Sequence, residues 1–214
     1  MSRAATATKA PLRLVSSPAR GEVGLDDEAL ILAVQRGDRQ VASALYDRLI
    51  RVVDHTVYRV FGRREADHDD LVQMVFEQII VTLSRQSYAR ACNLRTWASS
   101  IASHVAFNAL RSRRRERKVM DREAPADSEA YAARGDAERE VAARSDLQLV
   151  RATLVEMKPQ YAETVFLHDV LGHELAEIAL MMRVSVAAAQ SRLVRGRKDL
   201  HRRLSLASAR GGLS

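Results

Sequence analysis

The sequence predicts an all-α fold: two small helical domains joined by a flexible acidic linker, with a helix-turn-helix in the C-terminal domain. Three observations favour this class. Aromatic residues make up only 5% of the 214 residues, so the cores must be packed mainly with aliphatic side chains. The chain has only 9 glycines and 4 prolines, too few for the many turns of a β-sheet protein. Apolar residues also recur at the helical period over long stretches.

Composition and periodicity divide the chain into five parts. Residues 1–24 are rich in Ala, Ser, Thr and Arg and show no period, which predicts a disordered basic tail. Helical domains are expected over residues 25–118 and 146–207. Acidic residues outnumber arginines in residues 119–145, which predicts a flexible linker. An acidic tether would either compete with DNA for the basic domains or only keep the chain soluble. Residues 208–214 are again expected to be disordered.

The composition limits which partners and which cellular compartment are expected. The net charge of +7 and the pI of about 10.0 favour nucleic acid first and an anionic membrane surface second. Cys92 is the single cysteine, which excludes an internal disulfide and a zinc site built on cysteine pairs, and which fits a reducing cytoplasm. No apolar run approaches the roughly 18 residues of a membrane span, and no secretory signal is expected at the N-terminus. No cofactor is expected.

The first domain is predicted to begin with two helices. Acidic residues from Asp26 onward suit the positive end of a helix dipole, and an apolar stripe that includes Leu32 follows them. A second helix is expected over residues 39–61, where apolar residues recur at i, i+4 and i+8. Gly62 is expected to end it as a C-cap.

A third helix is expected from Leu71, with a broad apolar stripe that includes Ile80. Its outer face carries Asp70, Gln73, Met74 and Glu77. An exposed methionine beside acids and amides suits a protein-binding surface, whereas an ordinary solvated face is the simpler interpretation and the one that the pattern alone favours. The acids and the histidine just before this helix suggest a metal site, but acids at a helix start need no metal and no second ligand cluster is spaced to complete one.

The fourth predicted helix spans residues 94–118 and ends in a dense basic run. The eight positions 111–118 include six basic residues and only one acidic residue. The helical period places Thr96, Ser103 and Phe107 on an exposed, uncharged flank that leads to this run. A polar reading face with a cationic end suits DNA, because cations bind phosphates while neutral groups approach bases. A solvated surface helix with a basic end is the alternative.

The second domain ends in two helices separated by a tight turn. Apolar spacing predicts helices on both sides of Pro159, and a short helix then ends near Met182. The turn Arg183-Val184-Ser185 follows, with Ser185 as the cap of a basic helix that carries most of the seven basic residues in 183–203. A short helix, a tight turn and a cationic helix in succession are typical of a DNA-binding helix-turn-helix.

Three stretches, in this order, resemble signature regions of the extracytoplasmic-function group of bacterial RNA polymerase sigma factors. The stretch that begins at Asp70, DLVQMVFEQI, resembles region 2.2 of the family. The stretch that begins at Leu94, LRTWASSIASHVAFNALRSRRR, resembles regions 2.3 and 2.4. The stretch that begins at Gly172, GHELAEIALMMRVSVAAAQSRLVRGRKDL, resembles region 4.2. By this resemblance, residues 25–118 are sigma region 2 and residues 146–207 are sigma region 4.

The resemblance implies three binding surfaces. Region 2.2 would dock on the clamp coiled coil of core RNA polymerase through Asp70, Gln73, Met74 and Glu77. Regions 2.3 and 2.4 would bind and open the −10 promoter element through Thr96, Trp97, Ser100, His104, Asn108, Arg111, Arg113, Arg114 and Arg115. Region 4 would bind the polymerase flap and read the −35 element through Ser185, Val186, Ala188, Gln190, Ser191, Arg192, Arg195 and Arg197. An anti-sigma factor is a further partner that the resemblance implies.

The sequence departs from the family at several of these positions. His104 and Asn108 stand where the family often has Asn and Asp, and Ala188 and Gln190 replace the usual Thr and Lys of the recognition helix. Arg183 occupies the position of the common turn glycine, where a positive φ would strain a non-glycine residue. The promoter sequence therefore does not follow from the family.

The favoured function is a sigma factor, without catalysis of its own, that directs promoter recognition, DNA opening and initiation at a specific regulon. The alternative is an autonomous transcription regulator that binds duplex DNA through its helix-turn-helix. An enzyme is disfavoured, because the sequence has no Gly-rich phosphate loop, nucleophile elbow or metal-ligand cluster.

Overall fold

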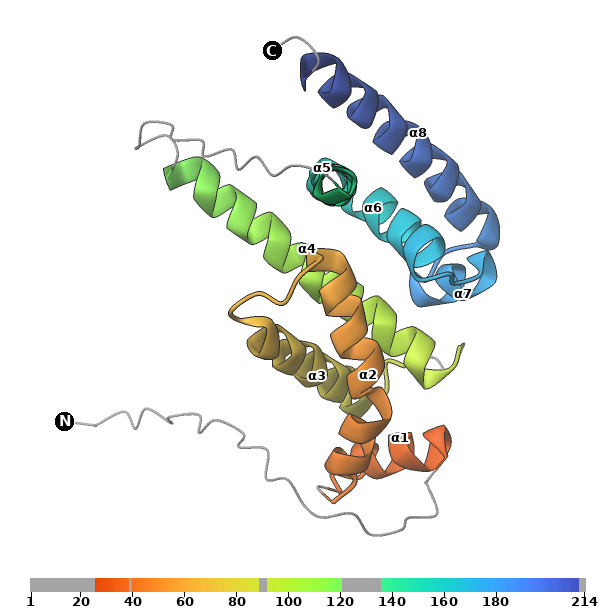
Figure 1. Ribbon diagram of the computed structural model, residues 1–214. Coiled ribbons are helices and arrows are strands. Elements are labelled where there is room, and N and C mark those ends of the chain that lie inside the picture. Colours follow the sequence, from red (N-terminus) through yellow and green to blue (C-terminus); the bar gives the residue numbers. More distant parts are fainter. Residues whose placement is uncertain (1–25, 39, 89–91, 121–135, 212–214) are drawn as a thin grey trace, which may run out of the picture.

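The structure is a computed structural model that describes residues 26–38, 40–88, 92–120 and 136–211 (Figure 1). Over these residues the chain forms helices and no strand, which confirms the prediction of an all-α fold with a C-terminal helix-turn-helix. The tail predicted over residues 1–24 lies outside the described residues.

Within the described ranges, four α-helices come before residue 121 and five helical elements come after residue 135. The first four are α1 (Asp27–Gln35), α2 (Val41–Phe61), α3 (His68–Ser84) and α4 (Leu94–Met120). The remaining five are α5 (Asp136–Glu156), α6 (Pro159–Val165), the π-helical turn η1 (Phe166–Val170), α7 (Leu175–Met181) and α8 (Val186–Gly211).

Both predicted ends of the linker are helical, so its boundaries 119–145 are corrected. The helix α4 runs on to Met120, and α5 begins at Asp136. Alanines and early acidic residues in α5 favour a helix and its N-terminal turn. The intervening residues lie outside the described part of the chain. The tail predicted over 208–214 is also too long, because leucine and alanine continue α8 to Gly211.

Local signals explain where several helices begin and end. The Asp26 carboxylate accepts a hydrogen bond from the Ala29 amide at 2.7 Å and so caps α1. Gly62 ends α2 with φ of +79°, as predicted, because the left-handed conformation costs glycine little. The helix α6 begins with Pro159 in its first turn, where the missing amide proton is not needed.

The buried faces of α1 and α3 differ in part from the predicted stripes. In α1 the buried residues are Leu30 and Ile31, whereas Leu32 is 36% exposed. Nearly every position in the middle of α1 is apolar, so periodicity alone does not identify the buried face. In α3, Ile79 is fully buried but Ile80 is 37% exposed, because consecutive residues on a helix point in different directions.

The helix α4 lies between the N-terminal helices and the C-terminal elements (Figure 1). It packs most extensively on α2 and α3, and on its other side it touches α5, α6 and α7. One continuous apolar core therefore includes Leu49 and Ile79 from the first domain and Leu154 and Phe166 from the second. The two helical domains are packed against each other, and α4 is covered on both sides.

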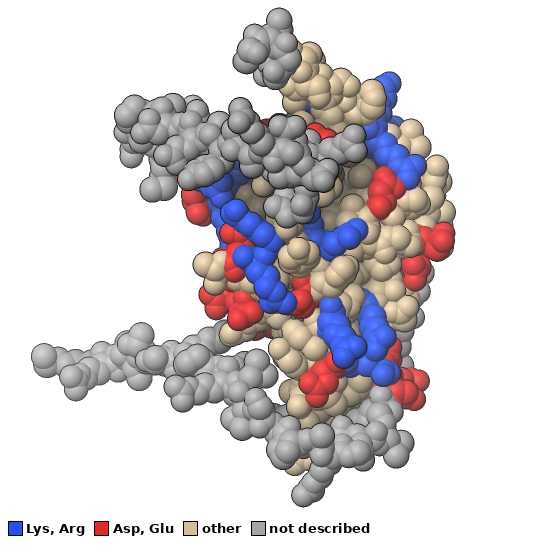
Figure 2. Space-filling model, viewed as in Figure 1, with Lys and Arg blue, Asp and Glu red and all other residues tan. Residues whose placement is uncertain are grey.

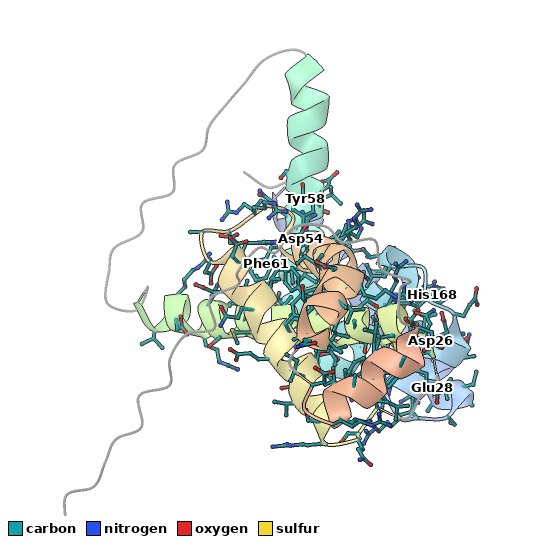
Figure 3. The ribbon with its side chains drawn as sticks, turned by 90° about the horizontal axis from the view of Figure 1, so that it is seen from below. Asp26, Glu28, Asp54, Tyr58, Phe61 and His168 are labelled. Carbon is teal, nitrogen blue, oxygen red and sulfur yellow. The ribbon has the colours of Figure 1, made fainter. Side chains whose placement is uncertain are left out.

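The histidine before α3 has a structural explanation. His68 is 3% exposed, and its Nε2 lies 2.8 Å from the Asp54 carboxylate of α2. Arg64 donates to the same carboxylate at 2.8 Å. Asp54 lies one turn before Tyr58 on α2, near Phe61 (Figure 3). Within the described residues, no group of three or more His, Cys, Asp or Glu side chains is arranged to hold a metal ion.

Candidate nucleic-acid interface

The start of α4 is fixed by its cap and by an aromatic pair. The Asn93 side-chain oxygen accepts a hydrogen bond from the Thr96 amide at 2.7 Å. The rings of Trp97 and Tyr88 pack at 4.6 Å between centroids. Both Thr96 and Trp97 are largely buried, at 8% and 9% exposure, so they shape the surface at this end of α4 rather than project from it.

The predicted exposed flank of α4 is wrong. Thr96, Ser103 and Phe107 are all buried, and Ser103 and Phe107 are each only 1% exposed. These residues are buried because α4 is covered by helices on two sides. Helical periodicity predicts a single buried face, so it does not reveal the second one. Ser103 satisfies its hydroxyl by donating to the Ser99 carbonyl oxygen at 2.8 Å.

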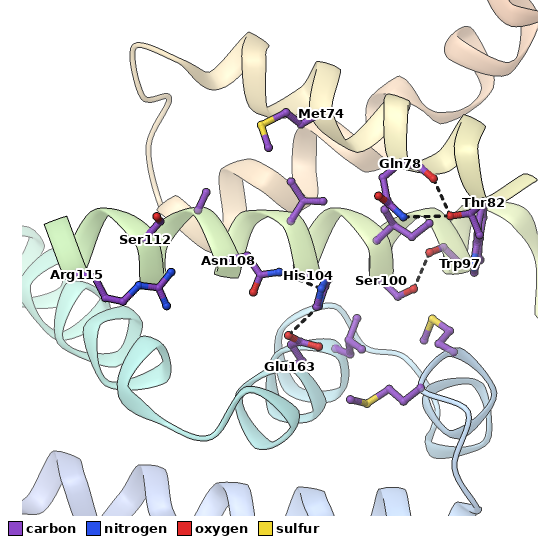
Figure 4. A pocket seen from close by; sticks show the side chains of 16 residues that line it. Met74, Gln78, Thr82, Trp97, Ser100, His104, Asn108, Ser112, Arg115 and Glu163 are labelled. Atoms are coloured by element: carbon purple, nitrogen blue, oxygen red, sulfur yellow. Dashed lines mark hydrogen bonds and ion pairs between the residues drawn. The ribbon is translucent and has the colours of Figure 1, made fainter. Parts of the chain in front are cut away.

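Five of the predicted −10 residues line a cavity of about 820 Å³ (Figure 4). From α4 it is lined by Trp97, Ser100, His104, Asn108 and Arg115, among others. Its opposite walls come from α3 and from the C-terminal elements, through Met74, Gln78, Thr82, Glu163, Leu167, Met181 and Met182. Residues predicted to read the −10 element therefore face the second domain across a partly open space.

A polar cluster crosses this space. His104 Nδ1 lies 3.2 Å from Glu163 Oε1, and the Asn108 amide nitrogen lies 3.0 Å from His104 Nε2. Arg111 NH1 lies 3.7 Å from the same Glu163 oxygen. The hydrogen bond to Glu163 raises the pKa of His104, while burial lowers the pKa of Arg111. Glu163, a residue of α6, is thus the shared acceptor of this cluster.

The three arginines at the end of α4 have different surroundings. Arg113 pairs with Asp67 and lies 4.8 Å above the Phe61 ring. Arg114 pairs with Glu156 of α5. Arg115 is exposed and has no acceptor among the described residues. Figure 2 shows basic and acidic side chains adjacent to one another on this face, in keeping with such pairing. Arg115 is therefore the arginine of the three most available to a phosphate.

This difference gives a testable prediction. We expect Arg115→Ala to weaken binding to DNA duplexes of any sequence, and to reduce the slope of log K against log salt by about 0.9, the value for one phosphate contact. Thermal stability should not change, because Arg115 contacts no described acceptor. Arg113→Ala should instead lower the melting temperature, because it loses both Asp67 and the Phe61 ring. An unchanged salt slope for Arg115→Ala would contradict a phosphate role.

The predicted polymerase-binding residues lie along the outer face of α3. Asp70, Gln73, Met74 and Glu77 are all exposed. The Gln73 amide donates to Glu77 Oε1 at 3.2 Å, one helical turn away. Met74 is 52% exposed and also lines the cavity beside α4. The α3 face and the cavity are thus contiguous at Met74.

The helix-turn-helix forms as predicted. Glu177 accepts from the Glu174 amide at 3.1 Å at the start of α7, and Ser185 Oγ accepts from the Ala188 amide at 3.1 Å at the start of α8. Arg183 in the turn has φ of +53°, a left-handed conformation that costs a non-glycine residue roughly 1 kcal/mol. Its guanidinium donates to the Ser87 carbonyl oxygen, at 2.8 Å, in the loop before α4.

The predicted −35 residues differ in exposure along α8. Those at the exposed start or on the open side of the helix are Ser185, Val186, Gln190, Arg195 and Arg197. Ala188, Ser191 and Arg192 are half-buried. Arg197 is already paired with Asp169, and its guanidinium lowers the pKa of that carboxyl. Ser185, Val186 and Gln190 are therefore the predicted residues that are exposed at the start of α8.

The position of α8 depends on a close approach of two backbones. Gly196 is buried where α8 crosses α6. A Cβ atom at this position would lie 2.7 Å from Val165 Cγ2 and 3.1 Å from the Tyr161 carbonyl oxygen. Only glycine allows the two helices this separation.

Sequence reasoning did not identify the residues that join the two domains. Glu156 and Glu163 supply carboxylates from the second domain. The Ser99 hydroxyl lies 2.7 Å from His173 Nε2, and burial lowers the pKa of this histidine. These pairs are 42 or more positions apart in the sequence, and no local pattern identifies such contacts.

Comparisons with known proteins match both helical domains of the chain. The sigma-70 region 2 family matches residues 45–116, and the sigma-70 region 4 family matches residues 147–200. RNA polymerase sigma factor NccH of Alcaligenes xylosoxydans xylosoxydans is 29% identical over 178 residues, which cover 81% of this chain and 92% of NccH.

Two solved structures are similar. CnrH in complex with the cytosolic domain of CnrY is 23% identical with a TM-score of 0.50, covering 84% of this chain and 97% of CnrH. The sigma factor RpoE in complex with the anti-sigma factor NepR from Bartonella quintana is 20% identical with a TM-score of 0.44, covering 74% and 95% of the two chains. Among the described residues, no helix is long and apolar enough to cross a membrane.

Proposed function

Because the chain belongs to the sigma-70 family of RNA polymerase sigma factors, in its two-domain extracytoplasmic-function group, we propose a specific role for each of its surfaces in initiation. The α3 face of Asp70, Gln73, Met74 and Glu77 binds the clamp coiled coil of core polymerase. The assignment is supported by the exposure of all four side chains, none of which belongs to the buried core. Region 4 binds the flap.

The −10 element is bound and opened by α4 and the loop before it. Trp97 and Tyr88 form a rigid platform at the start of the helix, and Ser100, His104 and Asn108 extend from it along one line. Arg115 holds the duplex backbone beside the opened bases. Arg111, Arg113 and Arg114 serve this surface partly by positioning it, since each already contacts a carboxylate.

The −35 element is read by the start of α8. Ser185 and Val186 lie at the N-terminal end of this helix, where backbone amides and the helix dipole favour phosphate. Gln190 and Arg195 are exposed on α8 and reach the base edges and the adjacent backbone. The protein performs no catalysis of its own and works in the cytoplasm, where its polymerase works.

An anti-sigma factor is the regulatory partner we assign to the chain. The solved structures of CnrH and RpoE hold the cytosolic domain of CnrY and the anti-sigma factor NepR, respectively. The observation that carries the whole proposal is the presence of regions 2 and 4 in order, with an exposed α3 face and a helix-turn-helix.

Run-off transcription with purified core polymerase tests the proposal. A library of genomic fragments from the source bacterium serves as template, and core alone and core with a housekeeping sigma factor are the controls. We expect discrete transcripts that appear only when this protein is added. If it yields none but binds duplex DNA alone with sequence selectivity, it acts instead as an autonomous helix-turn-helix regulator.

A further inference from the structure

We propose that a second cavity, between the ends of α2 and α4 and the second half of α5, binds a small nucleotide such as a nucleoside diphosphate. This cavity has a volume of about 1060 Å³ and shares no lining residue with the cavity beside His104. Its walls include neither the α3 face nor the start of α8. The site is therefore additional to those proposed for polymerase and for the −35 element.

Arginines make up most of the charged lining of this cavity. They come from three segments of the chain, namely Arg59 and Arg63 at the end of α2, Arg113, Arg114 and Arg117 on α4, and Arg151 on α5. Of the described residues that line the cavity, Glu65 alone carries a carboxylate. Guanidinium groups bind phosphate through paired N–H donors, so their convergence from three segments predicts a phosphorylated ligand.

Only part of this positive charge is neutralised by the protein. Three of the arginines have carboxylate partners: Arg63 with Glu65, Arg113 with Asp67, and Arg114 with Glu156. The other three, Arg59, Arg117 and Arg151, pair with no carboxylate among the described residues. The Arg59 guanidinium donates instead to the Val170 carbonyl oxygen at 3.2 Å. A ligand with two phosphate groups would balance the charge that remains.

Arg151 is the arginine whose surroundings most favour a bound anion. It is half-buried, and it has no hydrogen-bond acceptor among the described residues. Its guanidinium lies against the backbone of Gly62, where a Cβ atom would overlap it, so the glycine leaves the space that this group occupies. Burial lowers the pKa of Arg151, and the charge of Arg59 acts in the same direction. A phosphate would supply the missing acceptor and offset this repulsion.

The rest of the lining suits a flat, partly apolar group. Tyr58 and Leu147 both line the cavity and are exposed, although each is a large side chain with an apolar surface. Figure 3 shows Tyr58 close to α5. Aromatic rings stack with nucleobases of any identity. A ligand that joins phosphates to a planar ring therefore matches both parts of the lining.

The shape of the cavity favours a small ligand over DNA. The helix α5 forms the wall opposite α2 and α4, so the space is bounded by both helical domains. Its volume is close to the upper end of the roughly 300–1,000 Å³ that is usual for small-molecule sites. A DNA duplex is too wide to enter such a space.

Isothermal titration calorimetry of the full chain tests the proposal, with ADP, pyrophosphate and adenosine as probes. We expect ADP to bind at one site per chain and adenosine to show no measurable binding. Pyrophosphate should bind about tenfold more weakly than ADP, because it has no ring to stack in the cavity. Equal affinities for ADP and pyrophosphate would overturn the assignment to a nucleotide, and a lack of ADP binding would overturn the site.

The variant Arg151→Met separates this cavity from a general attraction of anions to a basic protein. Methionine keeps an unbranched side chain and removes the charge. We expect the affinity for ADP to fall about 10- to 100-fold. Arg51→Met is the matched control, because it makes the same charge change at an exposed position of α2 outside the cavity, and it should leave ADP binding unchanged. Equal weakening by the two variants would refute the site.

A second variant and a competition experiment complete the test. Arg117→Met changes an exposed residue without a partner among the described residues, so it should weaken ADP binding without affecting folding. A short DNA duplex added to the ADP complex should not displace ADP. If the duplex displaces ADP and Arg151→Met weakens both ligands equally, the cavity belongs to the DNA-binding surface and the proposal is wrong.

Discussion

Replacing Phe107 with alanine is expected to lower the free energy of unfolding by about 3–5 kcal/mol, the usual cost of removing a large buried aromatic side chain. Phe107 is 1% exposed at the middle of α4. Its ring meets Phe166 edge-on at 5.3 Å, and the Arg111 guanidinium lies 5.4 Å from its centroid. The substitution would leave a cavity where the two domains meet.

Urea denaturation followed by circular dichroism measures this loss. Val119→Ala is the control on the same helix, because Val119 is 63% exposed and its truncation should change stability by no more than about 0.5 kcal/mol. A loss below about 1 kcal/mol for Phe107→Ala would mean that its surroundings collapse onto the space, or that the ring is not packed as described.

Reversing two charges on α3 is expected to weaken binding to core polymerase by about 10- to 100-fold. The change is Asp70→Lys with Glu77→Lys, two exposed residues seven positions apart and thus on one face of the helix. Stability should change little, because neither side chain is buried. Fluorescence anisotropy of labelled protein titrated with core polymerase measures the affinity.

The control for this pair reverses two other exposed acids. Asp47→Lys with Asp146→Lys makes the same total charge change, on α2 and α5. Equal weakening by both pairs would show that net charge, and not the α3 face, governs the association.

Local chemistry accounts for what the sequence predicted correctly. Gly62 ends α2 and Ser185 caps α8, each through interactions within a few residues. The long apolar periods of α2 and α3 likewise gave the core, with Leu49 and Ile79 fully buried. Such features depend on neighbours along one helix, which a sequence displays directly.

The errors arise where distant segments meet. Phe107 was assigned to an exposed flank because the second domain, which buries it, leaves no mark on the period of α4. Glu163 was missed because a single glutamate on a partly apolar helix has no local signature. The residues proposed to bind polymerase and promoter were chosen by motif resemblance. Whether each of them is exposed or paired depends on how the two domains pack, which the sequence does not show.

The absence of a side chain at Gly196 determines how closely α8 approaches α6, and with it the position of the start of α8. Ten residues separate Gly196 from Val186, so the reading tip of α8 lies about 15 Å from the crossing point with α6. A tilt of about 10° at the crossing would displace that tip by roughly 2.6 Å, close to the 3.4 Å rise between base pairs. The close contact of the two backbones at Gly196 therefore fixes the angle at which the start of α8 leaves its crossing with α6.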